Sequence, residues 1–260
     1  MIKISTGRPR ANAGRPTQKD VRVVYILRED IREPIIKSQV GMYLEKLKDA
    51  VSFSIVYLSK DERDPVVSGS HPPVGLEDVS QVARRFRRGT RGAAGFLNLL
   101  SLIRLTRHET RENDATLIHA RSYIPAAAAW MVSKWDGVPY IFDMRALWLE
   151  ELIVSGKLRR NSIPHKLLQA VERRLLRDAA AVVSLTEAAV EYLETRYPEE
   201  LAGKRIRVIP TCADLDRFTP PAEPPQVPVY GCVGTVLSGW FRIEWLAAFF
   251  RAVARRDPAA

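Results

Sequence analysis

Apolar runs of strand length recur along the chain and are separated by segments with helical periodicity. The first run, 21–27, is almost unbroken, as expected for a strand that is buried on both faces. Pro34 stands where a helix can begin, and apolar residues then repeat at helical spacing as far as Leu47. A second strand is predicted at 51–58. The chain therefore opens with a strand, a helix and a strand.

An apolar-rich helical stretch covers 96–105, and the alternation then becomes regular. Strands are predicted at 115–120, 138–143, 181–185 and 205–210, with helices at 124–135, 163–179 and 186–197. Strands alternating with helices of this length predict an α/β fold, a Rossmann-like doubly wound parallel sheet. Right-handed crossovers would bring the carboxyl ends of all strands to one edge of the sheet.

Two segments of different composition delimit this domain, which we assign to residues 21–219. Residues 1–20 are rich in Gly, Pro, Arg and Asn, and are interpreted as a flexible N-terminal segment. Residues 220–228 contain five prolines in nine positions, which is typical of a linker. Residues 229–260 then predict one strand and one amphipathic helix, the first βα unit of an incomplete second domain.

The composition narrows the class of protein. It is 46% hydrophobic and 27% charged, as in ordinary soluble domains, and no stretch approaches the ~18 apolar residues that a membrane span needs. The N-terminus lacks the apolar segment of a secretory signal. Cys212 and Cys232 have no ligand-like spacing, so a disulfide framework or a zinc site is not expected. We expect reduced thiols and a cytoplasmic protein.

The net charge of +10 is concentrated in one segment. Between residues 84 and 111, eight arginines face one acid, Glu109. A solvated charged face is the first interpretation. The second is an anionic membrane surface at the inner face of the membrane, because RRFRRGTRG precedes an apolar helical stretch. Nucleic acid is the least favoured partner, since no known motif accompanies the charge. The candidate membrane or anion patch comprises Arg84, Arg85, Arg87, Arg88 and Arg91.

Polar side chains gather directly after the predicted strands, where ligands bind in doubly wound sheets. Carboxylates and guanidinium groups can chelate neighbouring hydroxyls, and an indole can pack on a sugar ring, so this set suits a hydroxyl-rich ligand. The residues are His119, Arg121 and Ser122; Asp143, Arg145, Trp148, Glu150 and Glu151; Thr186 and Glu187; and Thr211, Asp214 and Asp216.

Most of these residues also have a purely structural explanation. His119 could be a hydrogen-bonded structural histidine, and Asp143 and Arg145 could form a salt bridge that closes the strand end. Trp148 could be packing, and the acids after it could begin a helix. Thr186 and Glu187 could cap a helix, and Asp214 and Asp216 could organise a turn between domains.

Five motifs in order resemble the N-terminal half of retaining glycosyltransferases of family 4, which have the GT-B fold. They are HARSY, FDMRALW followed by EE, SLTEAA, VIPTCADLDRF and YGCVGT. The string VIPTCADLDRFTP is the most telling, because it is similar to the junction between the two Rossmann-like domains of that family. The resemblance covers roughly residues 21–256.

The resemblance implies transfer of a sugar from a nucleotide-sugar donor to a glycan or a lipid-linked acceptor, with retention and without a metal ion or other cofactor. The N-terminal domain would bind the acceptor. His119 would lie near the donor sugar as the catalytic residue, and Gly234 would approach the donor phosphates. The acceptor side would be formed by Arg121, Asp143, Arg145, Trp148, Glu150, Thr186 and Glu187.

Two departures from the family pattern change the expected activity. The first strand continues into REDIREP, where the family often has a glycine-rich loop. The basic pair and paired glutamates that bind the donor in this family lie in the second domain and have no counterpart here. We therefore expect little or no transferase activity from the chain alone. The alternatives are a non-catalytic sugar- or lipid-binding remnant and a basic module that binds phosphates or membranes.

Overall fold

The structure is a computed structural model that describes residues 21–31, 33–59, 79–87, 93–211, 218–219, 223, 227–232 and 242–256. Seven strands of the described residues form one sheet in the order β3-β2-β1-β4-β5-β6-β7, and every neighbouring pair is parallel. The strands are β1 (Arg22–Ile26), β2 (Ser52–Ser59), β3 (Ser80–Arg85), β4 (Leu117–Arg121), β5 (Tyr140–Met144), β6 (Ala181–Ser184) and β7 (Arg205–Val208). The predicted doubly wound parallel sheet is confirmed.

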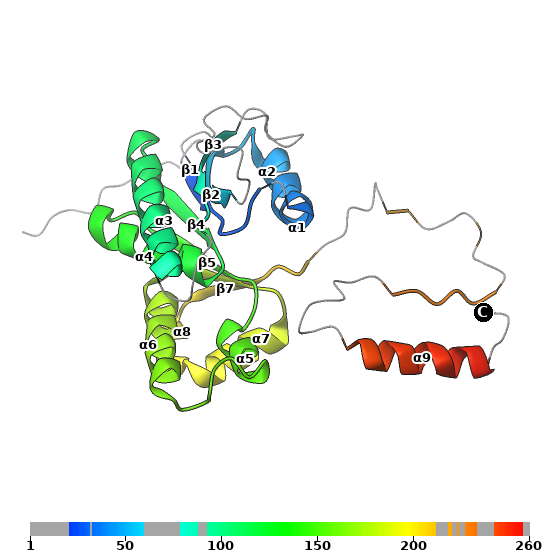
Figure 1. Ribbon diagram of the computed structural model, residues 1–260. Helices are drawn as coiled ribbons and strands as arrows, with labels where there is room; N and C mark the ends of the chain where they lie inside the picture. The colour runs from blue at the N-terminus through cyan, green and yellow to red at the C-terminus, as the bar shows by residue number, and fades with distance from the viewer. Residues whose placement is uncertain are drawn as a thin grey trace, which may run out of the picture.

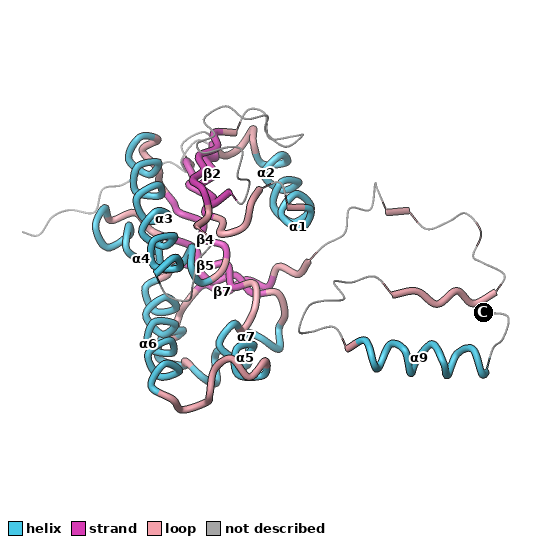
Figure 2. Tube along the Cα trace, in the orientation of Figure 1, coloured by secondary structure: helices cyan, strands magenta, loops and turns pink. Residues whose placement is uncertain are grey.

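One face of the sheet carries most of the helices. Figures 1 and 2 show α3 (Ala93–Glu112) and α4 (Tyr123–Asp136) on one side of the sheet, with α6 (Ile163–Asp178) continuing that layer. The shorter helices α5 (Trp148–Val154), α7 (Glu187–Arg196) and α8 (Pro198–Leu201) follow β5 and β6. Leu193 of α7 and Leu201 of α8 join the same core as α3, α4 and α6.

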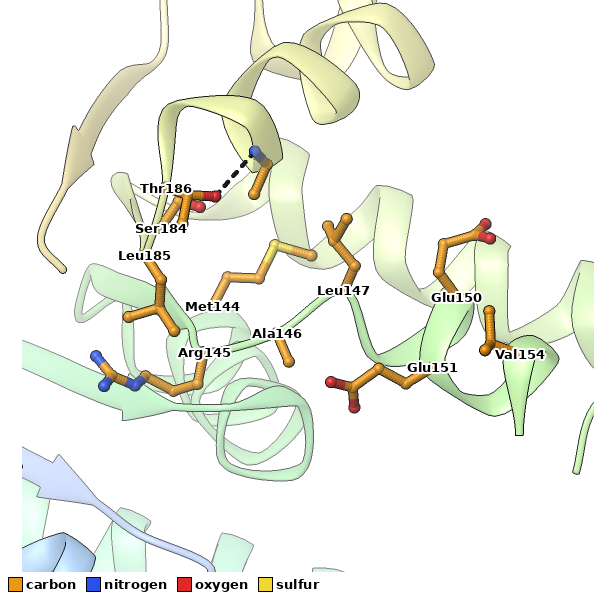
Figure 3. Close-up of a pocket in the computed structure, with 11 residues that line it drawn as sticks. Met144, Arg145, Ala146, Leu147, Glu150, Glu151, Val154, Ser184, Leu185 and Thr186 are labelled. Atoms are coloured by element: carbon orange, nitrogen blue, oxygen red, sulfur yellow. Dashed lines mark hydrogen bonds between the residues drawn. The ribbon is translucent and has the colours of Figure 1, made fainter. Parts of the chain in front are cut away.

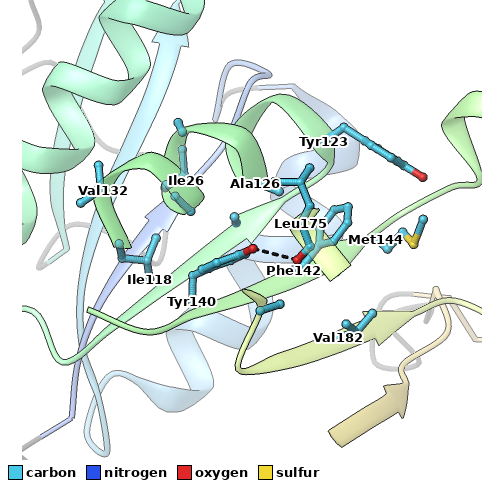
Figure 4. Packing of buried hydrophobic residues seen from close by; sticks show 14 of the residues in the cluster. Ile26, Ile118, Tyr123, Ala126, Val132, Tyr140, Phe142, Met144, Leu175 and Val182 are labelled. Atoms are coloured by element: carbon cyan, nitrogen blue, oxygen red, sulfur yellow. Dashed lines mark hydrogen bonds between the residues drawn. The ribbon is translucent and has the colours of Figure 1, made fainter. Parts of the chain in front are cut away.

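The period-2 alternation of the strands explains the two cores. Val24 and Ile26 of β1 point into the core beneath α3, α4 and α6, together with Ile118, Tyr140 and Phe142 (Figure 4). The Tyr140 phenol donates to the carbonyl oxygen of Leu175 over 2.7 Å and so ties β5 to α6. Tyr25 and Leu27 point to the opposite face. Strands buried on both sides give the continuous apolar runs seen in the sequence.

A single helical segment covers the opposite face. It consists of α1 (Pro34–Ile36), a π-helical turn, η2 (Lys37–Gly41), and α2 (Met42–Leu47). Ile36, Val40 and Leu44 are buried against β1, β2 and β3. Figures 1 and 2 show α1 and α2 on the side of the sheet away from α3. Within the part of the chain that the structure describes, no helix covers this face over β6 and β7.

The observed helices and strands agree with the predicted ones in some segments and differ from them in others. The helix predicted from Pro34 and the strand predicted at 51–58 are confirmed within a residue or two. β3 was not predicted, because its residues Gln81, Arg84 and Arg85 look like part of a charged loop. The amphipathic helix predicted within residues 229–260 is confirmed as α9 (Ile243–Arg256), which has no buried residue. Residues 229–232 are not in a strand, and residues 233–240 and most of the linker lie outside the described residues.

The helices of the structure include no candidate for crossing a membrane: within the described residues none is both long and apolar enough. The candidate arginine patch is only partly described. Arg84, Arg85 and Arg87 are exposed on or just after β3, and Arg88 and Arg91 lie outside the described residues. Arg107 and Arg111, in the same basic segment, both pair with Asp136 at 3.1 and 2.6 Å.

Candidate functional site

The strand order reverses direction between β1 and β4, which is where ligands bind in doubly wound sheets. A cavity of about 620 Å³ lies there, between the sheet and the helical segment η2–α2. We call it the β1/β4 cavity. Its walls include four predicted site residues, His119, Arg121, Asp143 and Arg145, together with Thr211. Sequence reasoning therefore selected residues that the fold brings together.

Strand register places the predicted residues at one level of the sheet. Arg121 of β4 is paired with Asp143 of β5, and His119 lies two residues before Arg121 on the same strand face. His119 Nε2 is 3.4 Å from Asp143 Oδ2, and Arg145 Nη1 is 3.6 Å from Asp143 Oδ1. Asp143 is thus held between an imidazole and a guanidinium group. The expected Asp143–Arg145 salt bridge is present.

Gln39 joins this cluster from the helical side and was not predicted. Its Oε1 accepts hydrogen bonds from Nη2 of Arg121 at 2.6 Å and from Nη2 of Arg145 at 2.8 Å. Gln39 lies in the π-helical turn η2, and such turns are frequent at functional sites because they redirect side chains. A lone glutamine in a predicted helix gives no sequence signal of this kind. Arg121 also lies 3.9 Å from Glu29.

The backbone beside the cluster is strained. Ser122, directly after Arg121, has φ 77° and ψ 176°, a conformation that only glycine adopts without cost. The hydrogen bond from its N–H to the carbonyl oxygen of Asp143, 2.8 Å long, holds this conformation. Strain of this kind persists where surrounding contacts fix the chain. Here the fixed backbone at Ser122 determines where the preceding residue, Arg121, lies at the end of β4.

Tyr25 forms the floor beneath His119. The two rings are tilted by 38° with their centroids 4.4 Å apart. Burial, and secondarily the charge of Asp143, raises the pKa of Tyr25 well above its ordinary value, so this phenol remains protonated. Tyr25 was expected only as a buried strand residue. Its ring limits the orientations that His119 can adopt.

A second hollow, the β5/β6 pocket, has a volume of about 400 Å³ and is lined by residues after β5 and β6. Figure 3 shows Arg145 and Glu150 pointing toward opposite ends of it, with Thr186 above. Thr186 Oγ1 accepts from the N–H of Ala189 at 3.1 Å and so caps α7. Glu187 is exposed in the first turn of α7. Arg145 lines both hollows.

Glu150 and Trp148 have structural contacts of their own. Glu150 accepts from Arg160 at 2.5 and 3.2 Å and from the Tyr192 hydroxyl at 2.7 Å. Burial acts to raise the pKa of Glu150, but the hydrogen bonds from Arg160 and Tyr192 outweigh it and hold this pKa below its ordinary value. The half-buried Trp148 packs against Tyr123, with ring centroids 5.3 Å apart. These contacts fix α5 on the domain.

Three predicted positions lie outside the residues that the structure describes. Gly234, the candidate for the donor phosphates, lies outside the described residues, as do Asp214 and Asp216. Among the described residues no group of three or more His, Cys, Asp or Glu side chains could hold a metal ion. The described site is therefore the β1/β4 cavity with the β5/β6 pocket beside it.

The family model described as Glycosyltransferase Family 4 matches residues 55–217, which is most of the described sheet and includes His119, Asp143 and Arg145. The chain belongs to glycosyltransferase family 4. A sequence search of curated proteins gives no match. The match includes the cavity residues of β4, β5 and β6, whereas β1 and the helical segment η2–α2 precede it.

Solved structures share this fold at low sequence identity. Sucrose-phosphate synthase from Thermosynechococcus elongatus is 15% identical with a TM-score of 0.55, and the alignment covers 78% of this chain and 51% of that one. A UGT transferase from Siraitia grosvenorii, crystallised with UDP, is 11% identical with a TM-score of 0.50, covering 76% and 53%. UGT2 from Phytolacca americana, complexed with UDP-2-fluoro-glucose and pterostilbene, is 12% identical with a TM-score of 0.50, covering 76% and 57%.

These similarities show the GT-B type of Rossmann-like domain. The chain spans about half the length of each of these three structures. The resemblance seen in the motifs is therefore confirmed at the level of family and fold.

Proposed function

We propose that this family 4 chain provides the acceptor side of a sugar transfer from a nucleotide sugar to a glycan or a lipid-linked acceptor, with retention of configuration. The observation that carries the proposal is the grouping of His119, Asp143 and Arg145 around one cavity at the carboxyl ends of β4 and β5, within the matched family domain. The UDP and UDP-sugar in two related structures support a nucleotide sugar as the donor.

In this proposal each residue of the cluster has a distinct task. Asp143 accepts a hydrogen bond from an acceptor hydroxyl, and Arg145 donates to a neighbouring oxygen. His119, held by Asp143 and stacked on Tyr25, faces the donor sugar. Gly234 approaches the donor phosphates. No metal ion or other cofactor takes part besides the nucleotide sugar.

The proposed location is the cytoplasmic face of a membrane, reached through the arginines at the end of β3. Arg84 and Arg85 are exposed there, and clustered arginines attract anionic lipid head groups. An independent explanation exists for these two residues. β3 is an edge strand, and charged side chains on an edge strand oppose pairing with another sheet.

Acceptor binding is the direct test, because it needs only the described domain. Saturation-transfer NMR with a panel of glycans and glycolipids would be run on the chain, on Asp143→Ala and on the control Glu112→Ala, whose side chain is exposed on α3. We expect binding by the chain and by the control, and a loss of about tenfold or more in Asp143→Ala. Absence of binding to every glycan and glycolipid would overturn the proposal.

Radiolabelled transfer from several nucleotide sugars to a membrane extract would be measured in parallel. Binding of an acceptor with little or no transfer is the expected result. Transfer with inversion of the anomeric centre would contradict the retaining mechanism. Salt-sensitive binding to polyanions without any sugar dependence would instead favour the basic binding module.

A further inference from the structure

The β1/β4 cavity is polar at one end and apolar at the other. At the carboxyl edge of the sheet it is bounded by Arg121, Asp143 and Gln39. Two residues earlier on the strands lie Tyr25 and His119, which are paired in register. Two residues earlier again, Val23 is paired with Phe53 on one side and with Leu117 on the other. Each step toward the amino ends of the strands is thus less polar.

The helical wall changes in the same direction. Because η2–α2 runs antiparallel to the strands, its first lining residue, Gln39, lies over the polar end, and Tyr43 and Leu47 follow toward the apolar end. Val51, just before β2, also lines that end, together with Lys46, which is exposed on α2 beside Leu47. The cavity therefore has a polar mouth at the carboxyl edge of the sheet and a largely apolar end that opens beside Lys46, and its 620 Å³ is within the range of small-molecule sites.

The polar mouth has hydrogen-bonding groups to spare. Asp143 Oδ1 and Arg145 Nε are both buried, and neither makes a hydrogen bond within the described residues. A buried acceptor and a buried donor left open cost free energy, and a hydroxyl group can satisfy both because it donates and accepts. The unused groups therefore indicate an alcohol function in the ligand.

The charges at the mouth favour a neutral ligand head. Arg121 and Arg145 are positive, but Asp143 lies 3.6 Å from Arg145 and Glu29 lies 3.9 Å from Arg121. The two guanidinium groups share the neutral oxygen of Gln39. A phosphate placed here would approach both carboxylates and be repelled, whereas a sugar or polyol would not.

We infer that the acceptor is a neutral amphiphile of the glycolipid class, with a hydroxyl-bearing head at Asp143 and Arg145 and a single apolar chain lying along Val23, Phe53 and Leu117. This inference rests on the proposed function for the role of the ligand as acceptor. It narrows the acceptor from glycans and lipid-linked compounds in general to an uncharged head group on an apolar chain.

Alkyl β-glucosides with chains of six, eight and ten carbons test this by calorimetric titration below their micelle concentrations. Each added methylene that leaves water should raise the affinity about three- to fourfold, until the cavity is full. Octyl phosphate should bind no more tightly than octyl glucoside. An affinity that does not depend on chain length, or tighter binding of the phosphate by tenfold or more, would overturn the inference.

Two variants separate the ends of the cavity. Leu117→Trp fills the apolar end and should abolish the chain-length dependence, while Gln39→Ala should weaken all three glucosides by a similar factor. Met42→Trp narrows the cavity from the helical side and serves if Leu117→Trp does not fold. Leu167→Trp, on the exposed surface of α6, is the matched control and should behave like the unchanged chain.

The results also separate this inference from the proposed function. Binding of free glycans with no gain from an alkyl chain would overturn the inference and leave the proposed function standing. Chain-length-dependent binding of glucosides with no binding of any natural glycan or glycolipid would overturn the proposed function, and would leave only a site for a neutral amphiphile without a role as acceptor.

Discussion

Arg121 donates from Nη2 to Oε1 of Gln39 over 2.6 Å, a contact between residues 82 positions apart in the chain. The same oxygen accepts from Arg145, so one neutral side chain holds two guanidinium groups beside the cavity. The helical segment η2–α2 is thereby tied to β4 and to the loop after β5. The geometry of the candidate site depends on this tie.

Gln39→Ala should therefore destabilise the domain as well as weaken ligand binding. Both guanidinium groups lose an acceptor while remaining largely buried, and we expect a decrease of about 1–3 kcal/mol in the free energy of unfolding. Urea unfolding measures it. Glu45→Ala, exposed on α2, is the control and should change stability by less than about 0.5 kcal/mol. Equal stabilities of the two variants would contradict a supporting role for Gln39.

Trp148→Ala should act mainly on stability. Because the indole packs against Tyr123 at 5.3 Å and touches the main core, we expect a loss of about 2–4 kcal/mol, with Trp148→Phe recovering more than half. Acceptor binding measured well below the unfolding transition would remain within about twofold. A stable Trp148→Ala variant that no longer binds glycans would instead support the predicted sugar platform.

Glu172 makes the stability of the folded protein decrease as the pH rises. It is buried and accepts hydrogen bonds from Tyr123 at 2.6 Å and from Tyr197. Burial raises the pKa of Glu172 above its ordinary 4.5, and the two phenols only partly offset this. The folded state then holds a proton more tightly than the unfolded state, so stability is greatest below pH 4.5 and falls as the pH rises through the folded-state pKa.

Glu172→Gln removes this titration. Urea unfolding at a series of pH values measures the effect. Between about pH 4 and pH 8 the free energy of unfolding of the variant should rise relative to that of the unchanged chain. A difference in stability that stays constant across this range would contradict the raised pKa.

Asp178 has the opposite effect, because it makes the stability of the folded protein decrease as the pH falls. Burial acts to raise its pKa, but hydrogen bonds from Trp130, Lys134 and Arg177 lower it to about 2 from an ordinary 3.8. The stability that this carboxylate contributes is present above pH 3.8 and is lost as the pH falls toward 2.

Asp178→Asn should therefore cost about 1–3 kcal/mol at neutral pH and progressively less in acid. The same urea series measures it. A cost that persists undiminished at about pH 2 would mean that packing, and not the charge, is what the variant loses.

The sequence was sufficient for the parallel sheet because its inner strands, such as β1 and β2, are buried on both faces. Runs such as 21–27 carry that signal directly, and polar residues follow the strands wherever they end. β3 was missed because an edge strand needs no continuous apolar run, and its Arg84 and Arg85 resemble a charged loop. Gln39 was missed because a π-helical turn, which leaves no mark on hydrophobic periodicity, sets its direction. Contacts between side chains far apart in the chain fix the site, and local patterns do not encode them.

The pairing of β1 has a consequence for how the protein is made. β1 lies between β2 and β4, and the backbone N–H of Arg22 donates to Thr116, 94 residues further along the chain. A nascent chain must therefore carry β1, an interior strand of the sheet, without one of its two neighbours until β4 leaves the ribosome, several seconds later at ordinary rates of translation. During that interval one edge of a strand whose last four residues are buried in the finished fold is open to other chains. We expect newly synthesised protein, and not the finished fold, to be the form that most requires a chaperone.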